Sequence, residues 1–338
     1  MKAGEVLHGY RIVTEPTNDG GGKCMWAFAE RDGHEYFIKR FLEPKLPREG
    51  RGSEASRRAR LRECALFENR HRTIMDRLRP DMAGAGNLVL ATDFFHERAT
   101  YYKVTERIDT ASMIEPHALD ARNRRVLLRT LALNLRLLHR LDVVHGDLKP
   151  TNVLIHQRAL NAFHTAKVID FDDAYLSGDP PPPDLIAGDS RYGAPEWVRY
   201  LRGDAGTGPA DLTTSADIFS MGLLTHLYLT GSLPAYDTDD HDSPAEAVDA
   251  GVPLRADMRL APGTRDLIEA MTAAEPERRP TAEALFDAFQ DPAMCALDRS
   301  AATARTGSSR IRRGLGASDA GTPSTRRPPH TQTPGSTD

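Results

Sequence analysis

The sequence predicts an α+β fold in which strands come first and helices follow, and three observations support it. From residue 10 the chain alternates apolar and polar residues as strands do, and an Asp-Gly pair at 32–33 joins two such runs as a hairpin. Past about residue 110 the apolar spacing becomes helical, most clearly over 119–141. Between residues 143 and 155, two short apolar runs flank a turn that is rich in polar side chains.

Composition limits the classes of function. The 338 residues suffice for one large or two modest domains, and a net charge of −4 provides no basic field for nucleic acid. The cysteines Cys24, Cys64 and Cys295 are too widely spaced for a disulfide framework or a metal site. No apolar run approaches a bilayer span and the N-terminus has no signal pattern, so we expect a cytoplasmic protein without a membrane span.

The first part of the chain predicts a five-stranded antiparallel sheet with one helix. Three strands are expected at 10–13, 25–28 and 35–41, and two more within 88–104, while a helix is expected over about 53–78. The glycines between the first two strands allow a close approach of backbone N–H groups to phosphate, although a flexible hairpin turn explains them equally simply: Gly20, Gly21 and Gly22.

The polar turn carries the candidate chemistry. Asp147, Lys149 and Asn152 fall within six residues, and Asp170 follows the next apolar run. Phosphoryl transfer needs a carboxylate to accept a hydroxyl proton, oxygen ligands for Mg²⁺, and cations against the developing negative charge. We therefore assign Asp147 as the base, Lys149 as the nearby cation, and Asn152 with Asp170 as the metal ligands, because two protein oxygens plus phosphates suffice for Mg²⁺.

These motifs resemble those of the protein kinase family. The segment 145–152 reads H-G-D-L-K-P-T-N where the family has H-R-D-L-x-x-x-N, and 170–172 reads D-F-D where it has D-F-G. Lys39 ends a strand resembling V-A-I-K, and 194–196 matches A-P-E. About eight such motifs occur in the family's order over residues 10–290, and the set resembles a bacterial eukaryotic-like serine/threonine protein kinase.

The resemblance implies a bilobal protein-kinase-like fold, with a sheet-and-helix N-lobe at 1–108 and a mainly helical C-lobe at 109–292. Residues 293–338 are basic and rich in Ser, Thr and Pro, which predicts a disordered tail or, less simply, a docking segment. The implied reaction transfers the γ-phosphoryl group of ATP, with Mg²⁺, to Ser or Thr hydroxyls of proteins, including its own. The implied partners are protein substrates and a cognate protein phosphatase.

The resemblance also assigns site residues. Lys39 is expected to contact the nucleotide phosphates and to pair with an acidic residue of the following helix. We prefer Glu63 because Leu66 and Phe67 would share its core-facing side, with Glu68 as the alternative. The other expected nucleotide contacts, besides the loop glycines, are Met25, Thr105, Glu106 and Ile108. The residues expected to support the fold of the site are His145, Phe171, Glu196, Asp217 and Arg279.

Some positions depart from the family pattern and keep other functions open. Gly146 replaces an arginine that binds an activation-segment phosphate in many kinases, Asp172 replaces a glycine, and Phe37 replaces a small residue of the adenine pocket. Asp189 is placed to pair with Lys149. Because the H-G-D and D-F-D sequences also resemble aminoglycoside and choline phosphotransferases, a small-molecule kinase is one alternative. A pseudokinase that acts as a binding scaffold is another, although Lys39, Asp147, Asn152 and Asp170 are all present.

Overall fold

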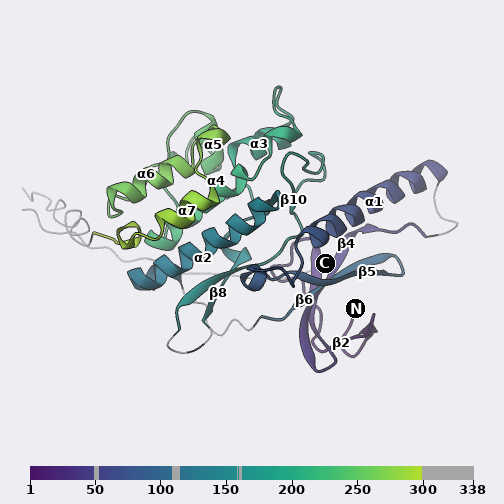
Figure 1. The fold of residues 1–338 in the computed structure, drawn as a ribbon. Helices are drawn as coiled ribbons and strands as arrows, with labels where there is room; N and C mark the ends of the chain where they lie inside the picture. The colour runs from purple at the N-terminus through teal and green to yellow at the C-terminus, as the bar shows by residue number, and fades with distance from the viewer. Residues whose placement is uncertain (49–52, 109–114, 158, 160–161, 299–338) are drawn as a thin grey trace, which may run out of the picture.

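The computed structural model describes residues 1–48, 53–108, 115–157, 159 and 162–298 (Figure 1). Its first part is an antiparallel sheet of six strands. In spatial order these are β1 (Val6–Leu7), β2 (Tyr10–Ile12), β3 (Cys24–Arg31), β4 (His34–Lys45), β6 (Thr100–Glu106) and β5 (Ala91–Glu97). The short β1 was not predicted. The apolar run 88–90 is not a strand of this sheet either, since Leu88 forms only an isolated bridge with Val168.

The alternation of side chains along the strands explains which face of this sheet is buried. One face carries small and branched side chains that are fully buried, namely Ala27, Ala29, Ile38 and Val104. The predicted hairpin joins β3 to β4, and Asp32 and Gly33 at its tip have φ of 52° and 76°. Two consecutive positive φ angles suit the right-handed twist of a hairpin, and Asp-Gly adopts them at little cost.

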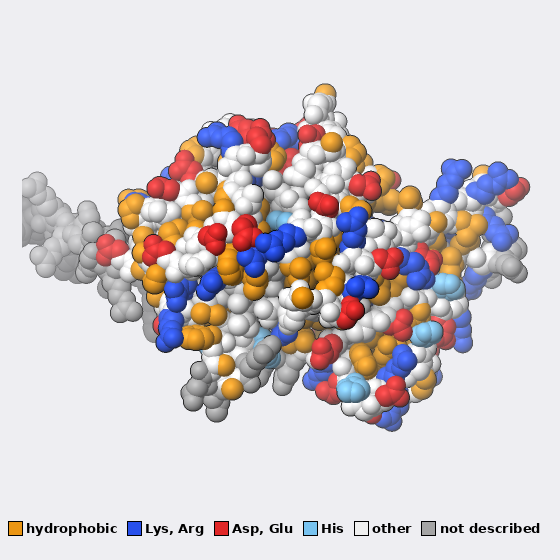
Figure 2. Space-filling model, in the orientation of Figure 1, with side chains coloured by type: hydrophobic (Ala, Val, Ile, Leu, Met, Phe, Trp, Pro, Cys, Tyr) orange, Lys and Arg blue, Asp and Glu red, His pale blue; other side chains and the backbone are white. Residues whose placement is uncertain are grey.

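Helix α1 (Glu54–Arg77) packs on the sheet and extends beyond it (Figure 1). It begins where the sequence predicts, because the Ser53 side chain accepts a hydrogen bond from the Ser56 N–H. Its buried residues are Cys64, His71 and Ile74, and none lies in its first ten residues. Figure 2 shows Lys and Arg side chains gathered over the projecting end, where Arg57, Arg58, Arg60 and Arg62 are exposed.

The rest of the described chain is mainly helical. Its core is built on α2 (Ala121–Arg140), in which Leu127, Leu131, Leu135 and Leu138 are fully buried. The helices that follow are α3 (Pro195–Arg202), α4 (Ser215–Thr230), α5 (Pro244–Asp249), α6 (Pro262–Met271) and α7 (Ala282–Ala288). The predicted α+β fold, an antiparallel N-terminal sheet followed by a helical part, is confirmed.

Four short strands flank the two polar segments that follow α2. They are β7 (Val143–Val144), β8 (Val153–Gln157), β9 (His164–Val168) and β10 (Tyr175–Leu176). β7 pairs with β10 and β8 pairs with β9, both antiparallel. The two polar segments at 145–152 and 169–174 therefore lie at the ends of paired strands.

The predicted tail begins too early. A 3-10 helix at Pro292–Cys295 packs against α2, and Cys295 is fully buried. Leu297 bridges to Leu260, so the chain is packed up to residue 298 rather than released at 293. A few apolar side chains of this stretch pack on the core, which explains the difference. The Pro and Ala residues around them make the average composition of the stretch resemble that of a disordered tail. Residues 299–338 lie outside the described part of the chain.

No helix within the described ranges is both long enough and apolar enough to cross a membrane.

Candidate functional site

The turn between β7 and β8 carries the predicted catalytic side chains, and a buried carboxylate from α4 fixes its backbone. Asp217 Oδ2 accepts a hydrogen bond from the His145 N–H at 2.8 Å, and Oδ1 accepts one from the Gly146 N–H at 3.1 Å. His139 Nε2 lies 3.1 Å from the same Oδ2. Asp217 is only 1% exposed, and a buried carboxylate requires donors of this kind. Asp217 thus holds the start of the turn in one conformation.

His145 lies beneath this turn. Its Nδ1 accepts from the Asp147 backbone N–H at 3.3 Å, and its Nε2 lies 3.0 Å from the Ile169 carbonyl oxygen. Because a carbonyl oxygen can only accept, the ring carries its proton on Nε2. The imidazole also packs against Phe171, with ring centroids 5.1 Å apart. With both nitrogens engaged by the backbone, His145 and Phe171 occupy supporting places below the loop.

Asp147 has one carboxylate oxygen held and one available. Asn152 Nδ2 donates to Asp147 Oδ2 at 2.9 Å, and Lys149 Nζ lies 2.8 Å from the same oxygen. Oδ1 is buried and has no hydrogen-bond partner among the described residues. Burial lowers the pKa of Lys149, but its hydrogen bond and charge interaction with Asp147 raise it overall. A fixed carboxylate with a free oxygen is suited to accepting a proton.

The β8–β9 pairing brings Asp170 to this turn. Val153 pairs with Val168, and the Ile169 N–H donates to the Asn152 carbonyl at 3.0 Å. Asp170 follows with φ of 65°, a left-handed conformation that is uncommon for non-glycine residues and is enriched at active sites. Asn152 and Asp170 therefore offer side-chain oxygens from adjacent segments, which fits the oxygen-ligand preference of Mg²⁺.

The predicted pairing of Lys39 with Glu63 is wrong. Lys39 Nζ lies 2.6 Å from Asp170 Oδ1 and 2.9 Å from Asp172 Oδ2. Glu63 is exposed on α1, and the alternative Glu68 pairs with Arg72 at 2.7 Å. The argument for Glu63 placed Leu66 in the core, whereas the structure leaves Leu66 54% exposed. The buried side of α1 instead follows Cys64, His71 and Ile74.

Asp172 bridges two lysines. Its Oδ1 lies 2.7 Å from Lys103 Nζ, while its Oδ2 takes Lys39. Burial opposes ionisation of Asp172, but Lys103 and Lys39 hold its pKa well below the usual range. Burial and the charge of Asp172 together raise the pKa of Asp170, and they raise that of Asp173 to about 6. The neighbouring carboxylates therefore differ in proton affinity, with Asp172 the most firmly ionised.

The strand face that carries Lys39 is lined by aromatic rings. Lys39 pairs with Trp26 and Phe37 pairs with Phe28, so these four side chains share one face. The rings contact one another, with Trp26 and Phe37 centroids 5.2 Å apart. Met25, an expected nucleotide contact, pairs with Arg40 and lies on the opposite face from Lys39, whereas Trp26 lies on the same face as Lys39.

The glycine loop forms the turn before β3. Gly20 and Gly22 have φ of 64° and 53°, and a Cβ on Gly21 would lie 2.8 Å from the Cys24 carbonyl oxygen. The backbone alone therefore explains glycine at all three positions. Trp26 Nε1 donates to the Asp19 carbonyl at 2.9 Å and ties the loop to the strand face of Lys39.

The C-terminal end of β6 carries the predicted hinge, next to the sheet face that carries Lys39. Thr105 pairs with Phe37 and Lys103 pairs with Lys39, so Thr105 shares the face of the lysines. Glu106 pairs with Tyr36 and is exposed, and Ile108 is half-buried. The hinge continues into residues 109–114, which lie outside the described part of the chain.

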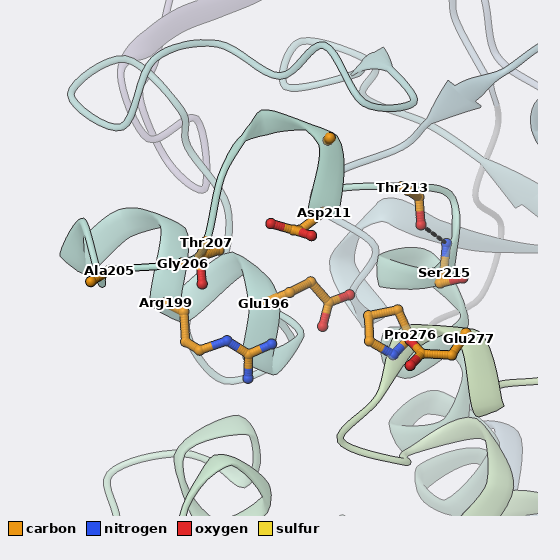
Figure 3. Close-up of a pocket in the computed structure, with 11 residues that line it drawn as sticks. Glu196, Arg199, Ala205, Gly206, Thr207, Asp211, Thr213, Ser215, Pro276 and Glu277 are labelled. Atoms are coloured by element: carbon orange, nitrogen blue, oxygen red, sulfur yellow. Dashed lines mark hydrogen bonds between the residues drawn. The ribbon is translucent and has the colours of Figure 1, made fainter.

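A buried ion pair ties α3 to the segment before α7. Arg279 Nη1 and Nη2 donate to Glu196 Oε1 and Oε2 at 2.7 and 2.8 Å, and both side chains are 0% exposed. Glu196 lies on the wall of a pocket of about 620 Å³, where Figure 3 shows it pointing towards Ser215 and Pro276. Glu196 is the only predicted site residue among those lining this pocket.

The comparisons agree with this geometry. The model of the protein kinase domain matches residues 67–289, which is more than half of the chain. The chain belongs to the protein kinase family. The match begins inside α1, so the glycine loop and Lys39 lie outside it.

Several curated relatives of the chain are serine/threonine-protein kinases by name. It is 28% identical to serine/threonine-protein kinase GRIK2 of Arabidopsis thaliana over 82% of this chain and 64% of the relative. It is 27% identical to serine/threonine-protein kinase RAD53 of Saccharomyces cerevisiae over 58% of this chain and 25% of the relative. The chain thus spans between a quarter and two thirds of the length of these relatives.

Sequence reasoning missed Lys103 and the position of Asp172 between two lysines. Strand alternation held the signal, since Lys103 lies two residues before Thr105 and opposite Lys39. From the sequence, Asp172 was recognised only as a residue that replaces the glycine of the family pattern. A pairing between segments 69 residues apart depends on the packing of the two lobes, which periodicity does not report.

Proposed function

We propose that this chain is an ATP- and Mg²⁺-dependent protein kinase that transfers the γ-phosphoryl group to Ser or Thr hydroxyls of proteins, including its own. The observation that carries the proposal is the state of Asp147. One of its carboxylate oxygens is fixed by Asn152 and Lys149, and the other is buried with no hydrogen-bond partner in the described part of the chain. A hydroxyl group would satisfy that oxygen.

The residues of the site then have separate tasks. Asp147 Oδ1 accepts the proton of the acceptor hydroxyl as its oxygen bonds to the γ-phosphorus and the bond from that phosphorus to the leaving ADP oxygen breaks. Lys149 and Lys39 offset the negative charge of the transferred group. Asn152 and Asp170 would hold Mg²⁺, which supplies further positive charge at the phosphates.

The identity of the acceptor is supported by Lys149. This lysine follows the base by two residues, as in the serine/threonine kinases that the chain resembles, and it contacts Asp147 directly. Asp189 Oδ2 lies 3.7 Å from Lys149 Nζ, so the segment 170–196, which corresponds to the activation segment of the kinases that the chain resembles, also reaches this lysine. The proposal includes protein substrates and an opposing phosphatase as partners. Three buried free cysteines suit a reducing, cytoplasmic compartment.

The proposal is tested with labelled ATP. The protein is incubated alone, with a basic protein substrate, and with a panel of aminoglycosides and choline. We expect label in the protein fractions, and Asp147→Asn should lower turnover by roughly 10²- to 10⁴-fold while ATP binding survives. The control is Asp204→Asn, which alters an exposed carboxylate outside the site and should leave turnover unchanged.

Each alternative has its own result. Label only in the small molecules would replace protein kinase by small-molecule phosphotransferase. An inactive parent protein that still binds ATP would favour a scaffold. Unchanged turnover in Asp147→Asn would remove Asp147 from the role of base.

A further inference from the structure

We propose that Asp172, held by Lys103, is the carboxylate that positions Lys39, in place of an acidic residue of α1. The inference rests on the proposed phosphoryl transfer, in which Lys39 contacts the nucleotide. Each oxygen of Asp172 takes a different lysine, Oδ2 at 2.9 Å from Lys39 and Oδ1 at 2.7 Å from Lys103. Asp172 and Lys103 are therefore positioning residues that act through Lys39.

The register of the sheet makes such a bridge necessary. Lys39 on β4 and Lys103 on β6 are directly paired, so their Cβ atoms are about 4.5–5.5 Å apart on one face. Like charges placed directly opposite on neighbouring strands repel each other. Lys103 is also only 6% exposed, and a buried ammonium needs a counter-ion. A single carboxylate between the two lysines removes both penalties.

Asp172 suits this task better than Asp170. Asp170 also reaches Lys39, but Lys103 has its ion pair with Asp172, and Asp170 is the candidate metal ligand. When Asp170 engages a cation, Lys39 retains Asp172. The backbone permits a side chain there, because Asp172 is not among the described residues with positive φ, whereas Asp170 is. A glycine at 172 is thus not required by conformation.

Helix α1 offers no competing acid to Lys39 within its described residues. Glu63 is exposed, and Glu68 is engaged by Arg72 and by the Tyr101 hydroxyl. The buried groups of α1 that interact with Asp172 are cationic or neutral, namely Arg70 and His71. The position of Lys39 is consequently coupled to the segment after β9 rather than to α1.

Four variants test the proposal: Asp172→Asn, Lys103→Met, the double variant with both changes, and Glu63→Gln as the matched control. ATP affinity is measured by titration in Mg²⁺ and again in EDTA, beside turnover and the unfolding temperature. Asp172→Asn should weaken ATP binding about 10- to 100-fold in both conditions, as is typical when a residue that orients a ligand-contacting group is lost. Glu63→Gln should bind ATP as the wild type does.

Three outcomes would overturn the proposal. The first is unchanged ATP affinity in Asp172→Asn. The second is a loss seen in Mg²⁺ but absent in EDTA, which would make Asp172 a metal ligand. The third is a loss in Glu63→Gln equal to that in Asp172→Asn. We expect the double variant to resemble Asp172→Asn rather than to add a second loss, because Lys103 acts through Asp172.

The design separates this inference from the proposed function. If Asp172→Asn fails to fold, the double variant decides, because it leaves no unpaired buried charge. Wild-type ATP affinity in a folded double variant would then overturn the proposal. A wild-type chain without turnover would overturn the proposed function, while the titration in EDTA still decides the role of Asp172.

Discussion

Gly146 leaves no room for a side chain. Its φ is +78°, and a Cβ there would lie 2.7 Å from the Asp173 carbonyl oxygen and 3.0 Å from Tyr175 Cε1. The Asp173 carbonyl and the Tyr175 ring both belong to the segment after β9. Because the carbonyl is a backbone group, it can move away only if this segment moves with it. The family's arginine is therefore excluded at this position by the path of the chain, and not merely absent from it.

This geometry predicts a steric cost for Gly146→Ala. Gly251 has the same φ of +78°, but a Cβ there would have no atom within 4 Å, so Gly251→Ala isolates the backbone cost. We expect about 1–2 kcal/mol of destabilisation for Gly251→Ala. Gly146→Ala should lose about 1–3 kcal/mol more, because the close contact is added. Urea unfolding of both variants measures the difference, and equal losses would contradict the steric argument.

Some site residues could be predicted from the sequence, and the partner of Lys39 could not. Asp147, Lys149, Asn152 and Asp170 come from two neighbouring motifs, and the structure brings them together because they lie at the ends of two paired strands close in sequence. The predicted pairing of Lys39 with Glu63 was wrong, because choosing the acidic partner requires knowing which side of α1 faces the sheet. An Arg-rich helix with few apolar residues does not define that side from sequence.

At the scale of elements, the segment 170–196 after β9, the activation segment by resemblance, is fixed by contacts that need no phosphate. The Ser177 N–H donates to the Asp142 carbonyl at 2.8 Å, and Ser220 Oγ donates to the Tyr192 carbonyl at 2.8 Å. Trp197 packs against Gly188 and Gly193, where a Cβ would approach its ring to 2.8 and 2.6 Å. The segment is thereby anchored to β7, α3 and α4.

The arginines of α3 are already engaged. Arg199 pairs with Asp249 at 2.6 Å, and Arg202 pairs with Glu246. A phosphate on the segment would have to compete with these carboxylates of α5 for a guanidinium. Together with Gly146, this leaves phosphorylation without the partner that it has in many kinases.

We therefore predict that phosphorylation of this segment is not required for activity. The double variant Ser177→Ala/Ser190→Ala should retain wild-type turnover, and phosphatase-treated wild-type protein should do the same. Turnover with labelled ATP measures both, with Asp147→Asn as the inactive reference. Complete loss of turnover in the phosphatase-treated protein would contradict the prediction.

The elements themselves were largely predictable, and their exceptions have physical causes. The helix over 119–141 and the hairpin at 32–33 followed from periodicity and turn chemistry, which are local. The run 88–90 looked like a strand of the sheet because it is apolar, but it packs on the helical part through Val168. Which of two cores an apolar run joins is a tertiary property.

At the scale of the whole molecule, Glu196 and Arg279 connect segments 83 residues apart. Arg279 has more partners than Glu196, because it also donates to the carbonyls of Ala273, Ser215 and Ala274 at 2.9, 2.9 and 3.2 Å. The guanidinium therefore joins α3, the start of α4 and the segment before α7 at one buried point. No other cation could reach these acceptors with the same planar fork.

This asymmetry predicts an order of stability. Arg279→Met leaves a buried carboxylate and three carbonyls without their donor, so it should destabilise by about 3–5 kcal/mol. Glu196→Gln removes the charge and turns one of the two acceptor oxygens into an NH2 donor, but it keeps the other acceptor and leaves Arg279 its three carbonyl partners, so we expect a smaller loss from it. The exposed pair of Arg58 and Glu54 provides the control, and Arg58→Ala should leave stability unchanged. Chemical denaturation measures the free energy of unfolding of the three variants. A greater loss for Glu196→Gln than for Arg279→Met would contradict the prediction and show that the carboxylate, rather than the guanidinium, organises this part of the molecule.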